Sequence, residues 1–104
     1  NLIDYLKETN GELSIELQNR IIYIIDVLDE LEIFHNDPNP CNFMFKKDQL
    51  FIIDYGYSKL IDNKLIKKYK TKNINKKFMI LGFIFRMEQL FKKKINYDIF
   101  KKYL

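Results

Sequence analysis

Several features that usually help to classify a protein are scarce or missing in this chain of 104 residues. The single cysteine, Cys41, excludes an internal disulfide and agrees with a reducing, cytoplasmic environment. No apolar run approaches the roughly 18 residues needed to cross a bilayer, and no secretory signal opens the sequence. We therefore expect a cytoplasmic protein without a membrane partner, built as one domain with a modest core.

Tryptophan and alanine are absent, valine occurs once and arginine twice, whereas lysine and isoleucine each occur 16 times. This bias is typical of A/T-rich codons, so the net charge of +4 is weak evidence for nucleic-acid binding. Selection for phosphate contacts would more often enrich arginine, whose planar guanidinium binds phosphate with two donors. We do not expect a nucleic-acid partner; tight, steeply salt-dependent binding would support that alternative.

Apolar residues recur at three- and four-residue steps in much of the chain, which predicts helices. A short helix is expected over residues 1–7, ending near Gly11, and Ser14 suits the N-cap of a long amphipathic helix over 15–31. Helices are also predicted over 78–90 and 96–104. The buried stripe of the long helix should pack on helix 78–90; its residues are Leu17, Ile21, Ile24, Ile25, Leu28 and Leu31.

Between these helices, residues 36–42 must form a loop, because prolines and asparagines disfavour regular structure. The short apolar runs 42–45 and 50–53 predict two strands joined by a turn. Gly56 follows the second strand and is free to adopt backbone angles that other residues avoid. The lysine-rich region 58–77 shows no clear pattern.

Polar side chains gather around this strand pair. His35, Asp37 and Asn42 lie in the loop before the first strand, and Asp54 comes directly after the second. Because a short hairpin brings its ends together, Asp37, Asn42 and Asp54 are expected to converge. Two carboxylates and an amide oxygen are hard ligands that suit Mg2+. A carboxylate beside a metal-bound phosphate can also accept a proton from an attacking hydroxyl, so the chemistry suggests metal-assisted phosphoryl transfer.

These residues also form a recognisable pattern. The run His-Asn-Asp-Pro-Asn-Pro-Cys-Asn at 35–42 resembles the catalytic loop H-R-D-L-K-P-E-N of eukaryotic-type protein kinases, and Asp-Tyr-Gly at 54–56 resembles their D-F-G motif. The segments 2–6, 15–31 and 81–84 are similar to three family helices in the same order. The resemblance covers about residues 1–92. It implies an α+β, mainly helical fold: residues 1–104 as a partial kinase-like C-terminal lobe with a small β-hairpin.

The resemblance also implies roles for the loop residues. Asp37 would be the catalytic base, Asn42 and Asp54 would hold Mg2+ and thereby ATP, and His35 and Gly56 would be structural. Asn39 takes the place of the lysine that touches the transferred phosphate in serine/threonine kinases. Loss of such a cation costs roughly 2–4 kcal/mol of transition-state stabilisation, by analogy with a deleted oxyanion donor.

Other departures from the family leave the substrate open. Asn36 replaces the arginine that often grips a phosphorylated activation segment, and Lys77 stands where the family usually has a buried aspartate that ties down the catalytic loop. The loop is also similar to H-G-D-L-H-P-G-N of kinase-like small-molecule phosphotransferases. The acceptor hydroxyl therefore belongs either to a protein, as in a serine/threonine kinase, or to a small molecule.

No Gly-rich loop, strand lysine or paired helix glutamate precedes the catalytic loop, and in the family these parts clamp ATP. We expect either that such an N-lobe lies before Asn1 in the natural product, giving an ATP-dependent kinase, or that the chain is not an enzyme by itself. In the second case it would be an inactive lobe that docks on another kinase or on a kinase substrate.

Overall fold

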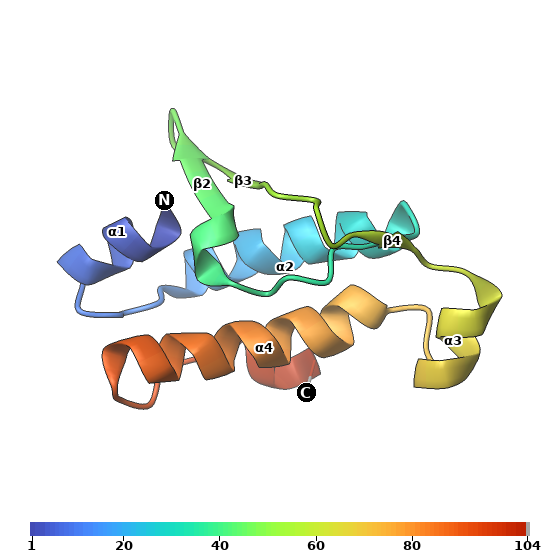
Figure 1. The fold of residues 1–104 in the computed structure, drawn as a ribbon. Coiled ribbons are helices and arrows are strands. Elements are labelled where there is room, and N and C mark those ends of the chain that lie inside the picture. Colours follow the sequence, from blue (N-terminus) through green and yellow to red (C-terminus); the bar gives the residue numbers. More distant parts are fainter. Residues whose placement is uncertain (104) are drawn as a thin grey trace.

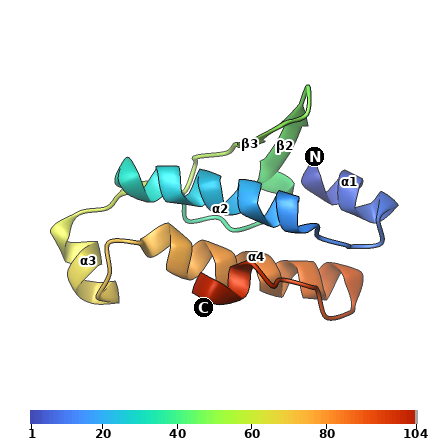
Figure 2. The ribbon, with the colours of Figure 1, turned by 180° about the vertical axis from the view of Figure 1, so that it is seen from behind.

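The computed structural model describes residues 1–103 and is built around two long helices that lie side by side (Figures 1 and 2). These are α2 (Ile15–Glu30) and α4 (Ile74–Phe91). The shorter helix α1 (Leu2–Glu8) lies at the end of α2 where that helix begins, and α3 (Asn63–Tyr69) lies at the opposite end. The fold is α+β and mainly helical, as the sequence predicted.

The starts of α1 and α2 follow local capping signals. The Asn1 side chain and Asp4 form a capping box at the start of α1. The Ser14 hydroxyl accepts a hydrogen bond from the Leu17 amide at 3.1 Å, which confirms the predicted N-cap of α2. After α1 the chain turns at Gly11, whose φ of 78° is one that glycine adopts without strain.

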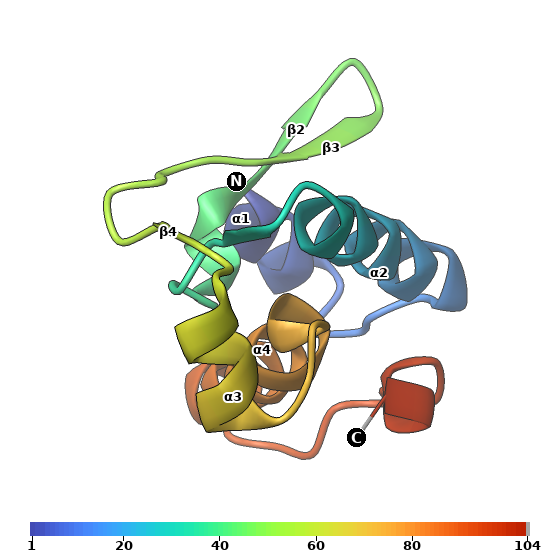
Figure 3. The same cartoon turned by 90° about the vertical axis from the view of Figure 1, so that its right-hand side faces the viewer.

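The predicted hairpin is present. Strands β2 (Phe43–Lys46) and β3 (Gln49–Ile52) pair antiparallel, with Phe43 opposite Ile52. Lys47 and Asp48 join them with φ values of 50° and 65°, as a two-residue turn matched to strand twist requires. The hairpin projects away from the helices (Figure 3).

A second, shorter strand pair holds the start of the loop. Strand β1 (Ile33–Phe34) precedes the loop and pairs antiparallel with β4 (Lys59–Leu60), which follows the Asp-Tyr-Gly motif. The region 58–77, which shows no clear sequence pattern, is largely structured: it holds β4, α3 and the start of α4.

Helix α4 begins at Ile74, four residues before the predicted start. The cause is a contact with α2: the carboxylate of Asp29 accepts hydrogen bonds from the backbone amides of Asn75 (2.8 Å) and Lys76 (3.1 Å). These amides lie in the first helical turn, where no intrahelical acceptor exists. A side chain from another helix thus caps α4.

The predicted packing of the long helix on the later one is confirmed, since α2 and α4 contact each other along the core. Ile21 and Ile25 of α2 are buried, as are Ile80 and Phe83 of α4. Leu31 was predicted to belong to the buried stripe, and this is wrong. It caps the end of α2 with 61% of its surface exposed, because the chain turns away there.

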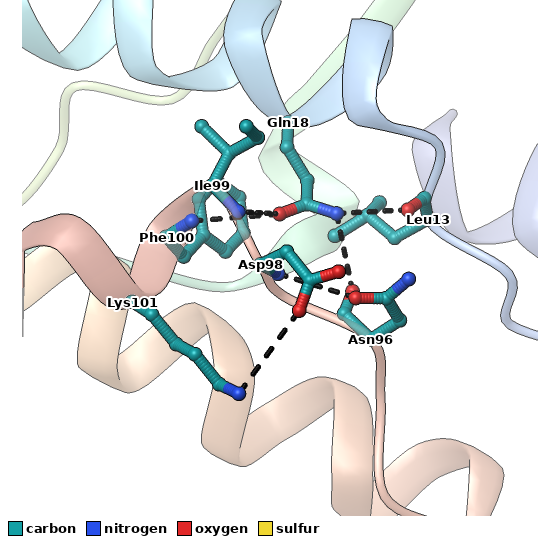
Figure 4. A network of polar contacts seen from close by, with 7 residues as sticks. All are labelled: Leu13, Gln18, Asn96, Asp98, Ile99, Phe100 and Lys101. Carbon is teal, nitrogen blue, oxygen red and sulfur yellow. Dashed lines mark hydrogen bonds and ion pairs between the residues drawn. The ribbon is translucent and has the colours of Figure 1, made fainter.

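The last predicted helix, 96–104, is reduced to a single 3-10 turn, η2 (Phe100–Tyr103); Leu104 lies outside the described residues. A fully buried glutamine on α2, Gln18, holds this turn (Figure 4). Its Oε1 accepts from the amides of Ile99 (3.0 Å) and Phe100 (3.4 Å), and its Nε2 donates to the carbonyls of Leu13 (2.9 Å) and Asn96 (3.2 Å).

Candidate active site

The loop that carries the candidate residues runs from β1 to β2 and passes between the hairpin and α4 (Figure 1). Its last part is a 3-10 turn, η1 (Pro40–Asn42), which contacts both α1 and α4. The Asn39 Oδ1 accepts a hydrogen bond from the Cys41 amide at 3.1 Å and so caps this turn. The loop is therefore supported by helices on two sides.

His35 is fully buried at the start of the loop. Its Nε2 lies 2.8 Å from the carbonyl oxygen of Ile53, and because a carbonyl only accepts, Nε2 carries the proton and donates. The imidazole also meets the Tyr55 ring edge-on, with 5.0 Å between ring centroids. The ring thus contacts the residues on either side of Asp54.

Asn42 connects the loop to the end of the hairpin. Its carbonyl oxygen accepts from the Ile53 amide at 2.8 Å, which extends the strand pairing by one step. Its side-chain Nδ2 donates to the carbonyl of Asp37 at 3.4 Å. One buried side chain thus bonds to the backbone that carries Asp37, while its own backbone pairs with the residue before Asp54.

Asp54 adopts a left-handed conformation, with φ at 63°. Its Oδ1 accepts from the Gly56 amide at 3.3 Å, a turn that aspartate forms readily. Gly56 does not use the conformational freedom that glycine has, because its φ is not positive. The chain changes direction at Asp54 itself, and the aspartate stabilises the left-handed angle through its own side chain.

A residue that the sequence analysis missed anchors the loop from α4. Asn75 is fully buried, and its Oδ1 accepts from the backbone amide of His35 at 2.9 Å. Its Nδ2 donates to the carboxylate of Asp29 at 2.9 Å and to the carbonyl of Ile33. These partners bind both the oxygen and the nitrogen of the side-chain amide and thereby set its orientation.

Lys77, where the family resemblance placed the loop anchor, is exposed, and its Nζ donates to the carbonyl of Tyr69 at 3.4 Å. A signal for Asn75 did exist in the sequence. It lies four residues before Met79 and eight before Phe83, on the apolar side of the helix, and a polar residue there is typical of a buried hydrogen-bonding role.

The carboxylate of Asp29 completes this anchor, because it accepts from both Asn75 and the start of α4. Burial raises the pKa of Asp29 above its ordinary value of 3.8, and the hydrogen bonds from Asn75 and Lys76 oppose that rise. The neighbouring Lys76 forms an ion pair with Asp26, whose hydrogen bond raises the pKa of the lysine. Two acids of α2 thus bind the start of α4.

The loop also packs directly on α4 at Gly82. A Cβ atom at Gly82 would lie 2.8 Å from the Cβ of Pro38 and closer still to its Cγ. Real side chains do not approach so closely, so the pyrrolidine ring occupies the space that any other residue would fill. This contact sets the distance between α4 and Pro38, the residue that follows Asp37.

Among residues 1–103 no cluster of three or more histidine, cysteine, aspartate or glutamate side chains is arranged to hold a metal ion. The candidate set has a different composition: the carboxylates of Asp37 and Asp54 and the amide of Asn42. The Asn42 NH2 group donates to the Asp37 carbonyl, and its Oδ1 accepts from the Cys41 thiol at 3.8 Å, a long contact that leaves the oxygen a lone pair for a cation. These hard oxygen donors fit Mg2+ by their chemistry.

Elsewhere on the surface, α2 and the hairpin enclose an apolar groove of about 750 Å3. Its lining includes Tyr23 and Phe51, and Arg20 borders it with bonds to Glu16 and to the Asp48 carbonyl. None of the candidate loop residues lines this groove. The groove and the loop are thus separate features.

Comparison with known proteins gives a short, partial match. Over 51 residues, 49% of this chain, the sequence is 41% identical to the probable serine/threonine-protein kinase irlC of Dictyostelium discoideum. The matched region is 4% of that protein's length. No protein-family model matches the chain, and no solved structure matches it. Within the described part, no helix is both long enough and apolar enough to cross a membrane. The sequence is thus similar, over half its length, to part of a serine/threonine kinase.

Proposed function

We propose that this chain is the carboxy-terminal lobe of a protein-kinase-like phosphotransferase, which transfers the γ-phosphate of Mg·ATP to a hydroxyl group. The observation that carries the proposal is the double link to Ile53. His35 donates to the Ile53 carbonyl, and the Asn42 carbonyl accepts from the Ile53 amide. These two bonds hold the loop against the backbone that carries Asp54. The partial similarity to a serine/threonine kinase supports the same reaction class.

In this proposal Asp37 orients the acceptor hydroxyl and accepts its proton. No hydrogen bond among the described residues uses the Asp37 carboxylate; only its backbone carbonyl is engaged, by Asn42. Asn42 and Asp54 would hold Mg2+, which when bound neutralises charge on the phosphates. The acceptor is a serine or threonine of a protein, with a small-molecule hydroxyl as the alternative.

The remaining parts of the loop restrict movement of these groups. Asn75 holds the His35 amide, Pro38 rests on Gly82, and Asn39 caps η1. Positioning of this kind contributes to catalysis because a reacting group held in place needs no reordering at the transition state. Covering of the nucleotide requires a second lobe, which would be supplied elsewhere in the natural protein.

The test is a phosphate-transfer assay with the complete natural gene product and Mg·ATP. Asp54→Asn and Asp37→Asn should each lower the transfer rate by two orders of magnitude or more, as is typical for loss of such a group. Asparagine tolerates the left-handed angle at position 54, so the Asp54→Asn backbone is preserved. Asp48→Asn is the matched control, since Asp48 is an exposed aspartate at the hairpin tip with φ at 65°.

Full transfer activity in Asp54→Asn would sink the assignment. If the complete wild-type protein transfers no phosphate and instead binds another kinase equally well with and without the Asp54 carboxylate, the docking alternative replaces catalysis.

A further inference from the structure

Of the two arginines in the chain, only one has its guanidinium satisfied within the described residues. Arg20 donates to the Glu16 carboxylate at 2.9 Å and to the Asp48 carbonyl at 2.8 Å. Arg86 of α4 is half-buried, and it takes part in none of the hydrogen bonds or ion pairs among residues 1–103. A guanidinium carries five donors and no acceptor, so Arg86 has donors available to a bound oxyanion.

Arg86 lines a groove of about 350 Å3 between α1, the candidate loop and α4. The lining residues are Ile3, Asn39, Cys41, Arg86, Gln89 and Leu90. None of them carries a carboxylate. Because the Asn39 Oδ1 already accepts from the Cys41 amide, the Asn39 side chain offers the groove its NH2 group.

The lining of the groove therefore includes one cation and no anion. Arg86, Asn39 and Gln89 can each donate, and apolar Ile3 and Leu90 border them. A guanidinium matches the planar oxygens of a carboxylate or phosphate with two parallel hydrogen bonds, and amide donors add to that preference. This composition favours an oxyanion over a cationic group.

The groove also lies beside the candidate base. Asn39 follows Asp37 by two residues, and since consecutive Cα atoms are about 3.8 Å apart, their Cα atoms are separated by at most about 7.6 Å. Arg86 lies one helical turn beyond Gly82, on which Pro38 packs. An anion held by Arg86 would therefore lie close to a hydroxyl presented to Asp37.

We propose that Arg86, Asn39 and Gln89 form a subsite for an anionic group, a carboxylate or a phosphate, that the acceptor substrate carries near its reactive hydroxyl. The role in acceptor selection rests on the proposed phosphotransferase function, whereas binding of an oxyanion at the groove does not. The substrate class is thus an acidic or previously phosphorylated acceptor.

The test is an NMR titration of the 104-residue chain with three short peptides at equal ionic strength. Each peptide contains a serine and differs at one nearby position, which is glutamate, phosphoserine or glutamine. The glutamate or phosphoserine peptide should shift the Arg86 Nε–H signal and the side-chain amide signals of Asn39 and Gln89, and the glutamine peptide should not. Preference between the two charged peptides identifies the source of the anion.

Arg86→Gln should weaken binding of the preferred charged peptide about tenfold or more, because a hydrogen bond to a charged group is worth about 1.5–3 kcal/mol. Arg20→Gln removes the same charge from a different surface and should leave the affinity unchanged. Equal binding of the glutamine peptide, unchanged affinity in Arg86→Gln, or an equal loss in Arg20→Gln would overturn the proposal.

The two experiments distinguish failure of the anion subsite from failure of the proposed phosphotransferase function. The peptide titration needs no ATP and no turnover, so it reports on the groove alone. The transfer assay on the complete protein, with its Asp54→Asn variant, reports on catalysis. Oxyanion binding without transfer would remove the acceptor role and leave the subsite.

Discussion

At the scale of single residues, the described part of the chain buries four polar side chains: Gln18, His35, Asn42 and Asn75. Three of them bond to the candidate loop or lie within it, and the fourth holds the last turn. A buried polar group is costly unless it is paired, so each of these contacts specifies one arrangement of the backbone around it.

Asn75 should be the most sensitive of these positions to truncation. Asn75→Ala leaves the His35 amide and the Ile33 carbonyl without partners, and each unpaired buried group costs about 1–3 kcal/mol. We expect the free energy of unfolding, measured by urea denaturation, to fall by at least the cost of one such unpaired group. Asn73→Ala is the control, because Asn73 is exposed and its side chain makes no capping bond. Equal effects of the two variants would contradict the anchoring role.

At the scale of elements, the candidate loop is positioned by the fit of one element against another. The Pro38 ring lies directly on α4, and only glycine at position 82 leaves room for it. Glycine inside a helix costs about 1 kcal/mol relative to alanine, so this close approach is retained at some expense in helix stability. The position of the loop therefore depends on its contact with α4 at Gly82.

Gly82→Ala tests this fit, because two effects of opposite sign compete. Alanine favours the helix by about 1 kcal/mol, whereas overpacking against Pro38 costs about 1–3 kcal/mol. We expect the second effect to dominate, with lower stability and shifted backbone amide signals at Asp37 and Asn42. Leu81→Ala, at an exposed neighbouring position, should leave those two signals in place. A Gly82→Ala protein that is more stable and has unchanged loop signals would refute the contact.

At the scale of the whole molecule, contacts between residues far apart in sequence hold the last turn against the helices. The last turn returns to α2, where Gln18 binds residues about 80 positions later (Figure 4). Phe100 then meets Phe83 of α4 edge-on, with 5.8 Å between centroids. The C-terminal turn thus completes the core between the two long helices.

Gln18→Leu should release this turn while α2 and α4 remain packed. Leucine cannot accept from the Ile99 and Phe100 amides, so their hydrogen exchange should become much faster, whereas Ile25 in the core of α2 should change little. Asn19→Leu, on the exposed side of the same helix, is the matched control. Slow exchange at Ile99 and Phe100 in Gln18→Leu would show that other contacts hold the turn.

Features that depend on local periodicity and local capping could be predicted from the residue pattern alone. It predicted the two long helices, the Ser14 cap and both hairpin strands to within a few residues. It also placed Asp37 and Asn42 in a loop before the hairpin and Asp54 after it. These features follow from side chains a few positions apart, which is the range over which residue pattern carries information.

The start of α4 and the residue that anchors the loop depend instead on contacts between elements. Asp29 and Asn75 are 46 positions apart, and Asn75 and His35 are 40 apart. Hydrogen bonds over such separations require α2 and α4 to be packed together, so the pattern around Asn75 indicates burial but not the groups that this side chain binds. The same packing brings Arg86 beside Asn39 and creates the groove to which we assign anion binding.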